Sequence, residues 1–158
     1  MGRVAGPQAS PASTRARMRA AVTGDADDVA HLLDALGYPC SRVEASERIA
    51  HTLHDPRQAL LIADIGGEAC GLVALQTLYS VVHGTDLTRI TALVVSPLHQ
   101  RQGIGRRMLR EVEALARRTG AARIEVTSNA RRVEAHQFYR DCGYADGSLR
   151  FIKLLGDA

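Results

Sequence analysis

The residues best suited to chemistry form a short glycine-rich loop, Gln100-Arg101-Gln102-Gly103-Ile104-Gly105, that opens onto a stretch with helical spacing. Two glycines separated by one residue let a backbone approach a ligand closely, and free N–H groups at a helix start attract phosphate oxygens. Arg106 and Arg107 follow in the first helical turn. Exposed cations there oppose the helix dipole by roughly 0.3–1 kcal/mol each, and a bound anion would reverse that interaction. The loop therefore indicates a site for an anion such as a phosphate.

Three kinds of nucleotide-binding loop could carry this pattern. A P-loop requires Lys and then Ser or Thr after its last glycine, whereas Gly105 is followed by Arg106 and Arg107. A dinucleotide-binding fingerprint needs a third glycine where the chain has Met108, and it should follow an early strand. The third kind is Q/R-x-x-G-x-G after a strand that leaves through V-x-P, as in Val95-Ser96-Pro97. That last pattern is typical of the pyrophosphate loop of acyl-CoA transferases.

The stretch from Ile90 to Tyr144 combines this loop with two flanking motifs, L-V-V-x-P before it and A-H-x-F-Y-x-x-x-G-Y after it. The combination resembles the GNAT superfamily of acyl-CoA-dependent N-acyltransferases, and the resemblance covers about residues 18–155. It implies an α/β (α+β) fold with a mixed, mostly antiparallel central sheet flanked by helices. It also implies an enzyme that moves an acetyl group from acetyl-CoA to a primary amine of a small molecule or peptide. The expected mechanism is direct attack in a ternary complex, with no metal.

The resemblance also assigns roles to individual positions. The strand end at 93–95 resembles the splayed strand whose backbone pairs with pantetheine and points one N–H group at the thioester carbonyl. The loop at 101–106 resembles the cradle of the pyrophosphate, and Asn129 resembles a polar residue that contacts the cofactor. Tyr139 aligns with a tyrosine that protonates the departing thiolate. The residues expected to bind acetyl-CoA are Leu93, Val94, Val95, Gln100, Arg101, Gln102, Gly103, Ile104, Gly105, Arg106 and Asn129.

The chemistry fits these residue types. Attack of an amine on a thioester builds an oxyanion, which a preorganised backbone N–H can stabilise. A tyrosine hydroxyl stays protonated at neutral pH, so Tyr139 can donate a proton to the thiolate. Tyr139 also shares a helical face with Ala135, Phe138 and Cys142, so a packing role stays open. Asn129 could likewise cap the following helix.

The general base is not assigned by the sequence. A primary amine must lose a proton before it attacks, which costs about 4–5 kcal/mol at pH 7. Many GNAT enzymes place a glutamate on the strand before the pyrophosphate loop, but residues 88–92 contain no carboxylate. His83, Asp86 and His99 are the candidates, and water-mediated deprotonation is the alternative. A catalytically silent acyl-CoA sensor also stays open for the same reason.

Hydrophobic periodicity predicts the order of the elements. A short strand at 18–22 precedes a helix after Asp25 that ends at Gly37, and a weaker helix spans about 44–53. A hairpin and a third strand follow at 59–65, 69–78 and 88–95. A helix at 103–119, a strand at 123–127, a helix at 133–142 and a last strand at 148–155 complete the pattern.

Charge is distributed unevenly along the chain, although the net charge is only +3. Residues 20–99 carry −6 and residues 100–140 carry +6. The acidic part is expected to line the acceptor pocket, which favours a cationic amine, a polyamine or a basic peptide. The basic part suits the phosphates of acetyl-CoA, and with few aromatic residues for stacking we expect no nucleic-acid partner.

Length and composition set the remaining expectations. A chain of 158 residues with 46% hydrophobic residues is expected to form a single domain over 18–158, after a disordered tail at 1–17. Three widely spaced cysteines predict neither a disulfide framework nor a metal site and place the protein in the cytoplasm. No apolar run is long enough to predict a membrane span. A homodimer is a common arrangement in the GNAT family, and the sequence itself does not set the oligomeric state.

Overall fold

The computed structural model describes residues 15–127 and 133–156. The chain divides into two compact units, one ending at Glu125 and one beginning at Val126. Each unit is described separately.

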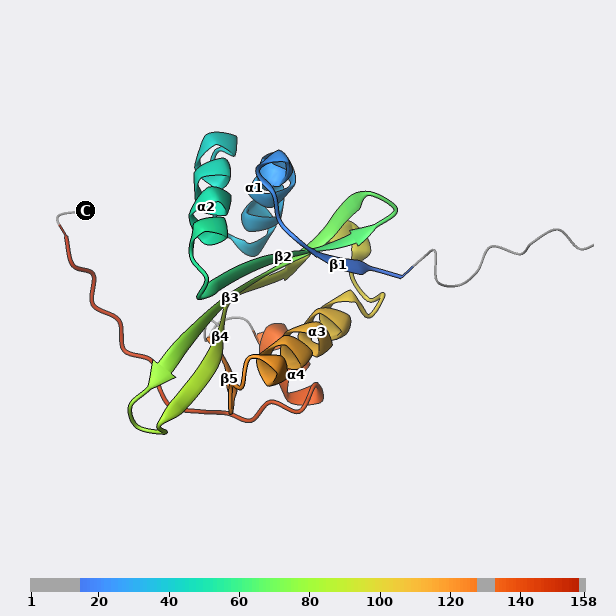
Figure 1. Cartoon of the computed structure of the whole chain (residues 1–158). Helices are drawn as coiled ribbons and strands as arrows, with labels where there is room; N and C mark the ends of the chain where they lie inside the picture. The colour runs from blue at the N-terminus through green and yellow to red at the C-terminus, as the bar shows by residue number, and fades with distance from the viewer. Residues whose placement is uncertain (1–14, 128–132, 157–158) are drawn as a thin grey trace, which may run out of the picture. The chain divides into compact units, whose positions relative to one another are not determined.

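The first unit is built on an open sheet with the strand order β1-β2-β3-β4-β5 (Figure 1). Neighbouring strands from β1 to β4 run antiparallel. Hydrogen bonds from Ala122 N to Asp86 O and from Thr88 N to Arg123 O join β4 to the start of β5, with both chains running the same way. The strands are β1 Arg17–Ala20, β2 Gln58–Ile65, β3 Glu68–Ser80, β4 Thr85–Val95 and β5 Ile124–Val126. The predicted fold class, a mixed and mostly antiparallel sheet flanked by helices, is confirmed.

The helices of this unit are α1 Ala26–Leu36, α2 Arg42–His54 and α3 Ile104–Arg118, with short 3-10 turns at Thr23–Asp25 and Pro97–His99. Each begins or ends where the sequence favours it. Gly37 ends α1 with a left-handed φ of 102°, which glycine adopts without a Cβ clash. Ser41 and Glu44 form a reciprocal capping box at the start of α2, two residues earlier than periodicity predicts.

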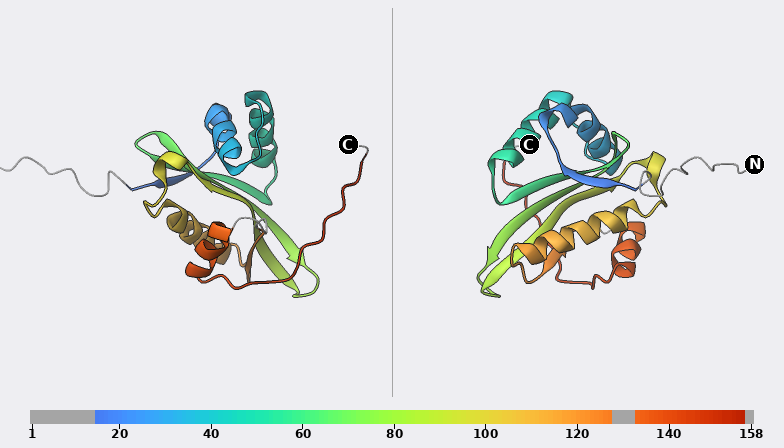
Figure 2. Two further views of the ribbon diagram at one scale, coloured as in Figure 1. Left: turned by 180° about the vertical axis from the view of Figure 1, so that it is seen from behind. Right: turned by 45° about the vertical axis from the view of Figure 1, so that its right-hand side comes forward.

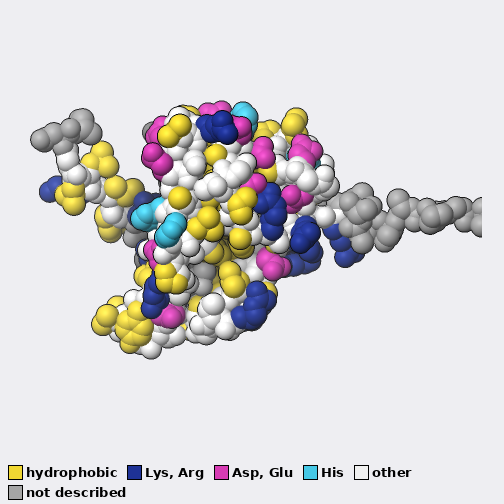
Figure 3. All heavy atoms as spheres, turned by 45° about the horizontal axis from the view of Figure 1, so that its top comes forward, with side chains coloured by type: hydrophobic (Ala, Val, Ile, Leu, Met, Phe, Trp, Pro, Cys, Tyr) yellow, Lys and Arg dark blue, Asp and Glu magenta, His cyan; other side chains and the backbone are white. Residues whose placement is uncertain are grey.

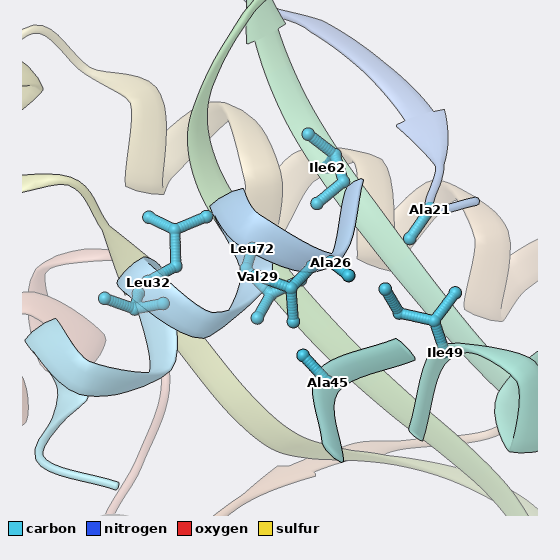
Figure 4. Packing of buried hydrophobic residues seen from close by; sticks show 9 residues of the cluster. Ala21, Ala26, Val29, Leu32, Ala45, Ile49, Ile62 and Leu72 are labelled. Atoms are coloured by element: carbon cyan, nitrogen blue, oxygen red, sulfur yellow. The ribbon is translucent and has the colours of Figure 1, made fainter. Parts of the chain in front are cut away.

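Two hydrophobic clusters lie on opposite faces of the sheet, because α1 and α2 cover one face and α3 covers the other (Figure 2). The first cluster packs apolar side chains of α1 and α2 against β2, β3 and β4 (Figure 4). The second joins α3 to the sheet, and Met108 is fully buried in it. At Gly71 of β3 a Cβ would lie 2.9 Å from Met108 Sδ and 3.2 Å from Val94 O. The absence of a side chain at Gly71 therefore permits the close approach of α3.

The second unit contains α4, Val133–Asp141, followed by an extended segment that is described as far as Gly156. Gly143 adopts φ 91° after the helix, and Arg140 pairs with Asp146 at 3.0 Å. The prediction of a last strand at 148–155 is wrong, since these residues form no strand. Alternating apolar residues favour an extended backbone, but a strand also needs a hydrogen-bonded neighbour, which the pattern does not supply.

Two further predictions concern the chain ends and the domain count. Arg17 already lies in β1 and Ala16 is 5% exposed, so ordered structure begins inside the segment expected to be a tail. Residues 1–14 lie outside the described residues, and a disordered tail there stays a prediction. The single domain over 18–158 also stays a prediction.

Candidate active site

The glycine-rich loop connects the end of β4 to the start of α3. Ser96 caps a short turn by accepting a hydrogen bond from Leu98 N, with Pro97 at the first position of the turn. The chain then reverses through Arg101, with φ 64°, and Gly103, with φ 77°. Gly103 is the N-cap of α3, so the loop residues predicted to bind pyrophosphate lead directly into the helix start.

The electrostatics of the α3 N-terminus favour an anion. The first turn contains no acidic side chain, whereas Arg106 and Arg107 both lie in it. Arg107 donates from Nε to the carbonyl oxygen of Ala16 at 2.7 Å, which ties the helix start to the chain just before β1. A cavity of about 340 Å³ beside this point is lined by Arg15, Ala16, Ile65, Gln102, Gly103, Ile104 and Arg107. The backbone and the arginines therefore fit a phosphate-bearing ligand at this end of α3.

A β-bulge interrupts β4 just before the residues predicted to bind pantetheine. Ala74 of β3 pairs with Ala92 and Leu75 pairs with Ile90, so Thr91 is an extra residue. Its hydroxyl donates to Ala74 O at 3.3 Å. Bulges bend a strand and re-aim its groups, and they are frequent beside active sites. Here the bulge lies two residues before Leu93, the first residue of the strand end predicted to bind pantetheine.

Beyond the bulge, the residues from Leu93 to Val95 are paired along their β3 edge, up to Gly71 opposite Val95. Leu93 and Val95 pack against the cluster under α3, and Val94 belongs to the cluster under α1 and α2. Side-chain packing on both faces therefore fixes the backbone that is predicted to pair with pantetheine.

The three candidates for the general base lie at the two ends of β4. Asp86 is near the start of β4 and forms an ion pair with Arg57 at 3.6 Å. His83 lies in the turn before β4 and contacts Arg123 through Nε2. His99 lies beyond the other end of β4, with Nε2 3.7 Å from Glu68 and a buried Nδ1 that has no hydrogen-bond partner. His83 and Asp86 therefore lie near one end of β4, and His99 lies near the other.

The site contains a carboxylate that the sequence did not single out. Glu125 of β5 accepts a hydrogen bond from Arg89 Nη2 of β4 at 3.2 Å and lies 3.5 Å from Arg123 Nε. Its side chain is half-buried. Residues 89 and 125 are remote in sequence, so only the pairing of β4 with β5 could have indicated their contact.

Ion pairs alter the expected effect of the acidic segment. Five of the ten acidic residues between 20 and 99 pair with arginines: Asp25 and Asp64 with Arg19, Asp27 with Arg42, Glu44 with Arg48, and Asp86 with Arg57. Acidic and basic side chains are accordingly interspersed on the α1 and α2 side of the molecule (Figure 3). Arg42, Arg48 and Arg57 are already counted in the charge of −6, so only Arg19, from outside the segment, offsets it further.

In the second unit, Tyr139 lies on α4 and is half-buried. Its ring lies 5.4 Å from that of Phe138 and 5.9 Å from that of Tyr144, measured between centroids. Asn129, the predicted cofactor contact, lies outside the described residues. Within the described ranges no helix is long and apolar enough to cross a membrane, and no three His, Cys, Asp or Glu side chains gather to hold a metal.

Residues 26–144 match the family model described as "Acetyltransferase (GNAT) family". This chain belongs to the GNAT family of acetyltransferases. The GNAT chain is 33% identical over 143 residues to an aminoalkylphosphonate N-acetyltransferase of Salmonella typhimurium, covering 87% of this chain and 90% of that protein. It is 28% identical over 145 residues to an aminoglycoside N(6')-acetyltransferase type 1 of Stenotrophomonas maltophilia, covering 88% of this chain and 84% of that protein.

Solved structures agree on the fold of the GNAT chain. A GNAT family acetyltransferase of Staphylococcus aureus superposes with a TM-score of 0.77 at 22% identity, covering 89% of this chain and 99% of that one. The predicted resemblance and the assignment as an acyltransferase are thus confirmed. The roles of individual site residues stay predictions.

Proposed function

We propose that this GNAT enzyme transfers an acetyl group from acetyl-CoA to a primary amine of a small molecule by direct attack in a ternary complex. The observation that carries the proposal is that the stretch from β4 to α3 contains both a β-bulge at Thr91 and a glycine N-cap, Gly103, at the start of α3. The bulge supports a reaction centre on β4, and the helix start supports a pyrophosphate site. Acetyl-CoA is the acetyl donor of the family and no metal is invoked.

The proposed donor site uses backbone more than side chains. The loop from Gln100 to Arg106 would hold the pyrophosphate through N–H groups of the α3 start, with the arginines of the first turn adding charge. The strand end from Leu93 to Val95 would hold pantetheine and direct one N–H group at the thioester oxygen. Asn129 stays a proposed contact from the resemblance alone.

Tyr139 is the proposed acid that protonates the thiolate of CoA as the tetrahedral intermediate collapses. Its position in the A-H-x-F-Y motif supports this role, and contacts with Phe138 and Tyr144 hold its ring. The C–S bond breaks, the electron pair stays on sulfur, and the tyrosine proton ends on that sulfur.

The acceptor amine is proposed to lose its proton to water. Asp86 lies seven residues from Leu93, about 23 Å along an extended strand, and is already paired with Arg57. His99 is mostly shielded from solvent, with a side chain 15% exposed, and faces Glu68. These contacts favour solvent over either side chain as the proton acceptor.

A second candidate function, a silent acyl-CoA sensor, is favoured by one observation. The stretch of β4 from Thr88 to Ala92 carries no carboxylate. Release of CoA thiol in the presence of amines separates the two functions, because a sensor would bind acetyl-CoA without releasing thiol. The enzyme is expected to release thiol only when a suitable amine is present.

The cytoplasm is the proposed location, and the odd number and wide spacing of Cys40, Cys70 and Cys142 support a reducing compartment. A homodimer is the proposed assembly. Five large apolar side chains in the C-terminal segment are at least two-thirds exposed, which supports an interface there. They are Leu149, Phe151, Ile152, Leu154 and Leu155.

A further inference from the structure

A row of polar side chains crosses four strands on one face of the sheet. Gln58 of β2 is in register with Gln76 of β3, and Gln76 is in register with Arg89 of β4. Arg89 in turn donates to Glu125 of β5 at 3.2 Å. Residues opposite one another on neighbouring strands share a face, so these four side chains lie side by side.

This row lies on the face that α1 and α2 cover. Leu60 follows Gln58 by two residues, so both point to the same face, and Leu60 packs against the cluster under α1 and α2. The β4 bulge places Arg89 there as well. Three residues separate Arg89 from Ala92, which would put them on opposite faces of a regular strand, but the extra residue Thr91 brings both to one face.

Arg89 is positioned to bind a ligand. Its side chain is 42% exposed, and the hydrogen bond to Glu125 uses one nitrogen of a group with five N–H donors. Glu125 also lies 3.5 Å from Arg123, which contacts His83. Two arginines therefore surround one carboxylate, and these three side chains together carry a net positive charge.

We propose that Arg89 binds an anionic group of the acceptor, so that the enzyme acetylates amines carrying a tetrahedral oxyanion such as a phosphonate or phosphate. The proposal rests on the proposed function and names the substrate class for that same site. The planar guanidinium matches such oxyanions with paired hydrogen bonds. Glu125 holds the guanidinium in place and is a positioning residue.

The distances suit a short acceptor. Arg89 lies four residues before Leu93, at most about 13 Å along an extended strand, and the bulge and the long arginine side chain reduce the gap. An amine one to three carbons from the phosphorus would thus place its nitrogen near the predicted thioester position at 93–95. A large polycation would instead bring positive charge against Arg89.

The test measures kcat and KM with acetyl-CoA and four matched amines: aminoethylphosphonate, taurine, ethanolamine and ethylenediamine. We expect kcat/KM to be highest for aminoethylphosphonate. The Arg89→Gln variant should lower that value by about 10-fold to 100-fold, through KM, because it removes hydrogen bonds to a charged group. Its effect on ethanolamine should stay below about threefold, within the scatter of surface substitutions.

Arg57→Gln is the matched control. Arg57 is an exposed arginine that forms an ion pair with Asp86. Asp86 lies three residues before Arg89 in a regular part of β4, so the Asp86 side chain points to the opposite face of the sheet from Arg89. The Arg57→Gln variant should leave kcat/KM unchanged for all four amines. Glu125→Gln should raise KM for aminoethylphosphonate several-fold, because Arg89 loses its anchor.

Binding of methylphosphonate by calorimetry to the acetyl-CoA-loaded enzyme provides a readout without turnover. Wild-type protein should bind it and Arg89→Gln should not.

The proposal is overturned if ethylenediamine is the best acceptor, or if Arg89→Gln lowers kcat/KM equally for the anionic and the neutral amines. If Arg89→Gln fails to fold, a several-fold weaker binding of methylphosphonate by Glu125→Gln supports the proposal and unchanged binding overturns it. Thiol release with cationic amines alone would overturn this inference and leave the proposed function intact, whereas no release with any amine would overturn the proposed function.

Discussion

Arg101 and Gly103 both adopt left-handed backbone conformations, with φ 64° and 77°. For a residue with a Cβ this conformation costs about 1–3 kcal/mol and persists only where the surrounding structure imposes it. Such residues cluster at ligand sites, and Arg101 lies in the loop that is proposed to hold pyrophosphate. The strain at Arg101 and the permissive Gly103 together shape the turn that delivers the chain into α3.

Replacement of Tyr139 by phenylalanine tests its proposed role as an acid. The Tyr139→Phe variant should lower kcat by about 10-fold to 100-fold, at the low end of general acid catalysis because a thiolate is a good leaving group. KM for acetyl-CoA should change little. Tyr144→Phe is the matched control, since Tyr144 is also half-buried and its ring contacts that of Tyr139. Equal losses of kcat in both variants would show that Tyr139 acts by packing.

Asp25 is a buried carboxylate whose charge contributes to stability. Two hydrogen bonds from Arg19, each 2.8 Å, and one from Val22 N lower the pKa of Asp25, against the effect of burial. A lowered pKa in the folded state adds stability that is present above the unfolded pKa and lost as pH falls through the folded pKa. The carboxylate therefore stabilises the fold at neutral pH.

The Asp25→Asn variant should reduce the free energy of unfolding at pH 7 by about 1.5–3 kcal/mol, measured by urea denaturation. The difference from wild type should shrink as pH falls below about 4, because the unfolded wild-type chain then binds a proton at Asp25 while the folded carboxylate, with its lowered pKa, stays charged to lower pH. Asp34→Asn on the exposed face of α1 is the control and should change stability by less than about 0.5 kcal/mol. A constant difference across that pH range would contradict the assignment to charge.

At the scale of elements, substitutions at the two ends of α3 can distinguish the effect of backbone strain from an effect on ligand binding. Gly103 before the helix and Gly120 after it both have positive φ, 77° and 80°, and an added Cβ at either meets nothing within 4 Å. Alanine at either position should therefore lower the free energy of unfolding by a similar amount, about 1–2 kcal/mol, because its Cβ disfavours the left-handed conformation.

Only Gly103→Ala should weaken the affinity for acetyl-CoA, because only Gly103 lies at the proposed pyrophosphate site. Calorimetric titration should show a Kd raised by about 10-fold or more, as expected for about 1.4 kcal/mol of lost binding. Gly120→Ala should bind as the wild type does. Equal affinities in the two variants would place the cofactor phosphates elsewhere.

Local patterns predicted most of these elements because their causes are local. The helix at 26–36 follows from apolar residues spaced three and four apart and from Gly37, and the hairpin between β2 and β3 follows from Gly66 and Gly67. The strand expected at 148–155 failed because pairing depends on a distant partner. The loop before α3 was predicted from its glycines alone.

The rest of the site depends on register, which one sequence does not reveal. Thr91 reads as an ordinary strand residue, yet its position as the bulge decides which face Arg89 occupies. Glu125 similarly reads as an alternating polar residue until β5 is placed beside β4. Counting charges along 20–99 also missed Arg19, which lies outside that segment and pairs with Asp25 and Asp64.

At the scale of the whole molecule, the C-terminal segment carries several strongly exposed apolar side chains, among them Phe151, 88% exposed, and Leu155, 91% exposed. If this segment forms the proposed dimer interface, light scattering should give twice the 17.0 kDa mass of the chain. Phe151→Asp should shift the species to the monomer. Val43→Asp, at an exposed apolar position of α2, should leave the dimer intact. A monomeric wild type would contradict the proposed assembly.

The two named relatives act on acceptors that differ in charge, although both are N-acetyltransferases. A shared fold therefore does not choose the acceptor, which must be argued from the residues of the site. In this chain we propose that Arg89, held by Glu125, makes that choice.

Release of CoA thiol from acetyl-CoA, followed with purified protein and a panel of anionic, neutral and cationic amines, tests the central claim most directly. We predict release that is proportional to enzyme, depends on the amine and yields the N-acetylated product by mass spectrometry. Binding of acetyl-CoA without thiol release on any amine would contradict the claim and identify the chain as a silent acyl-CoA-binding module.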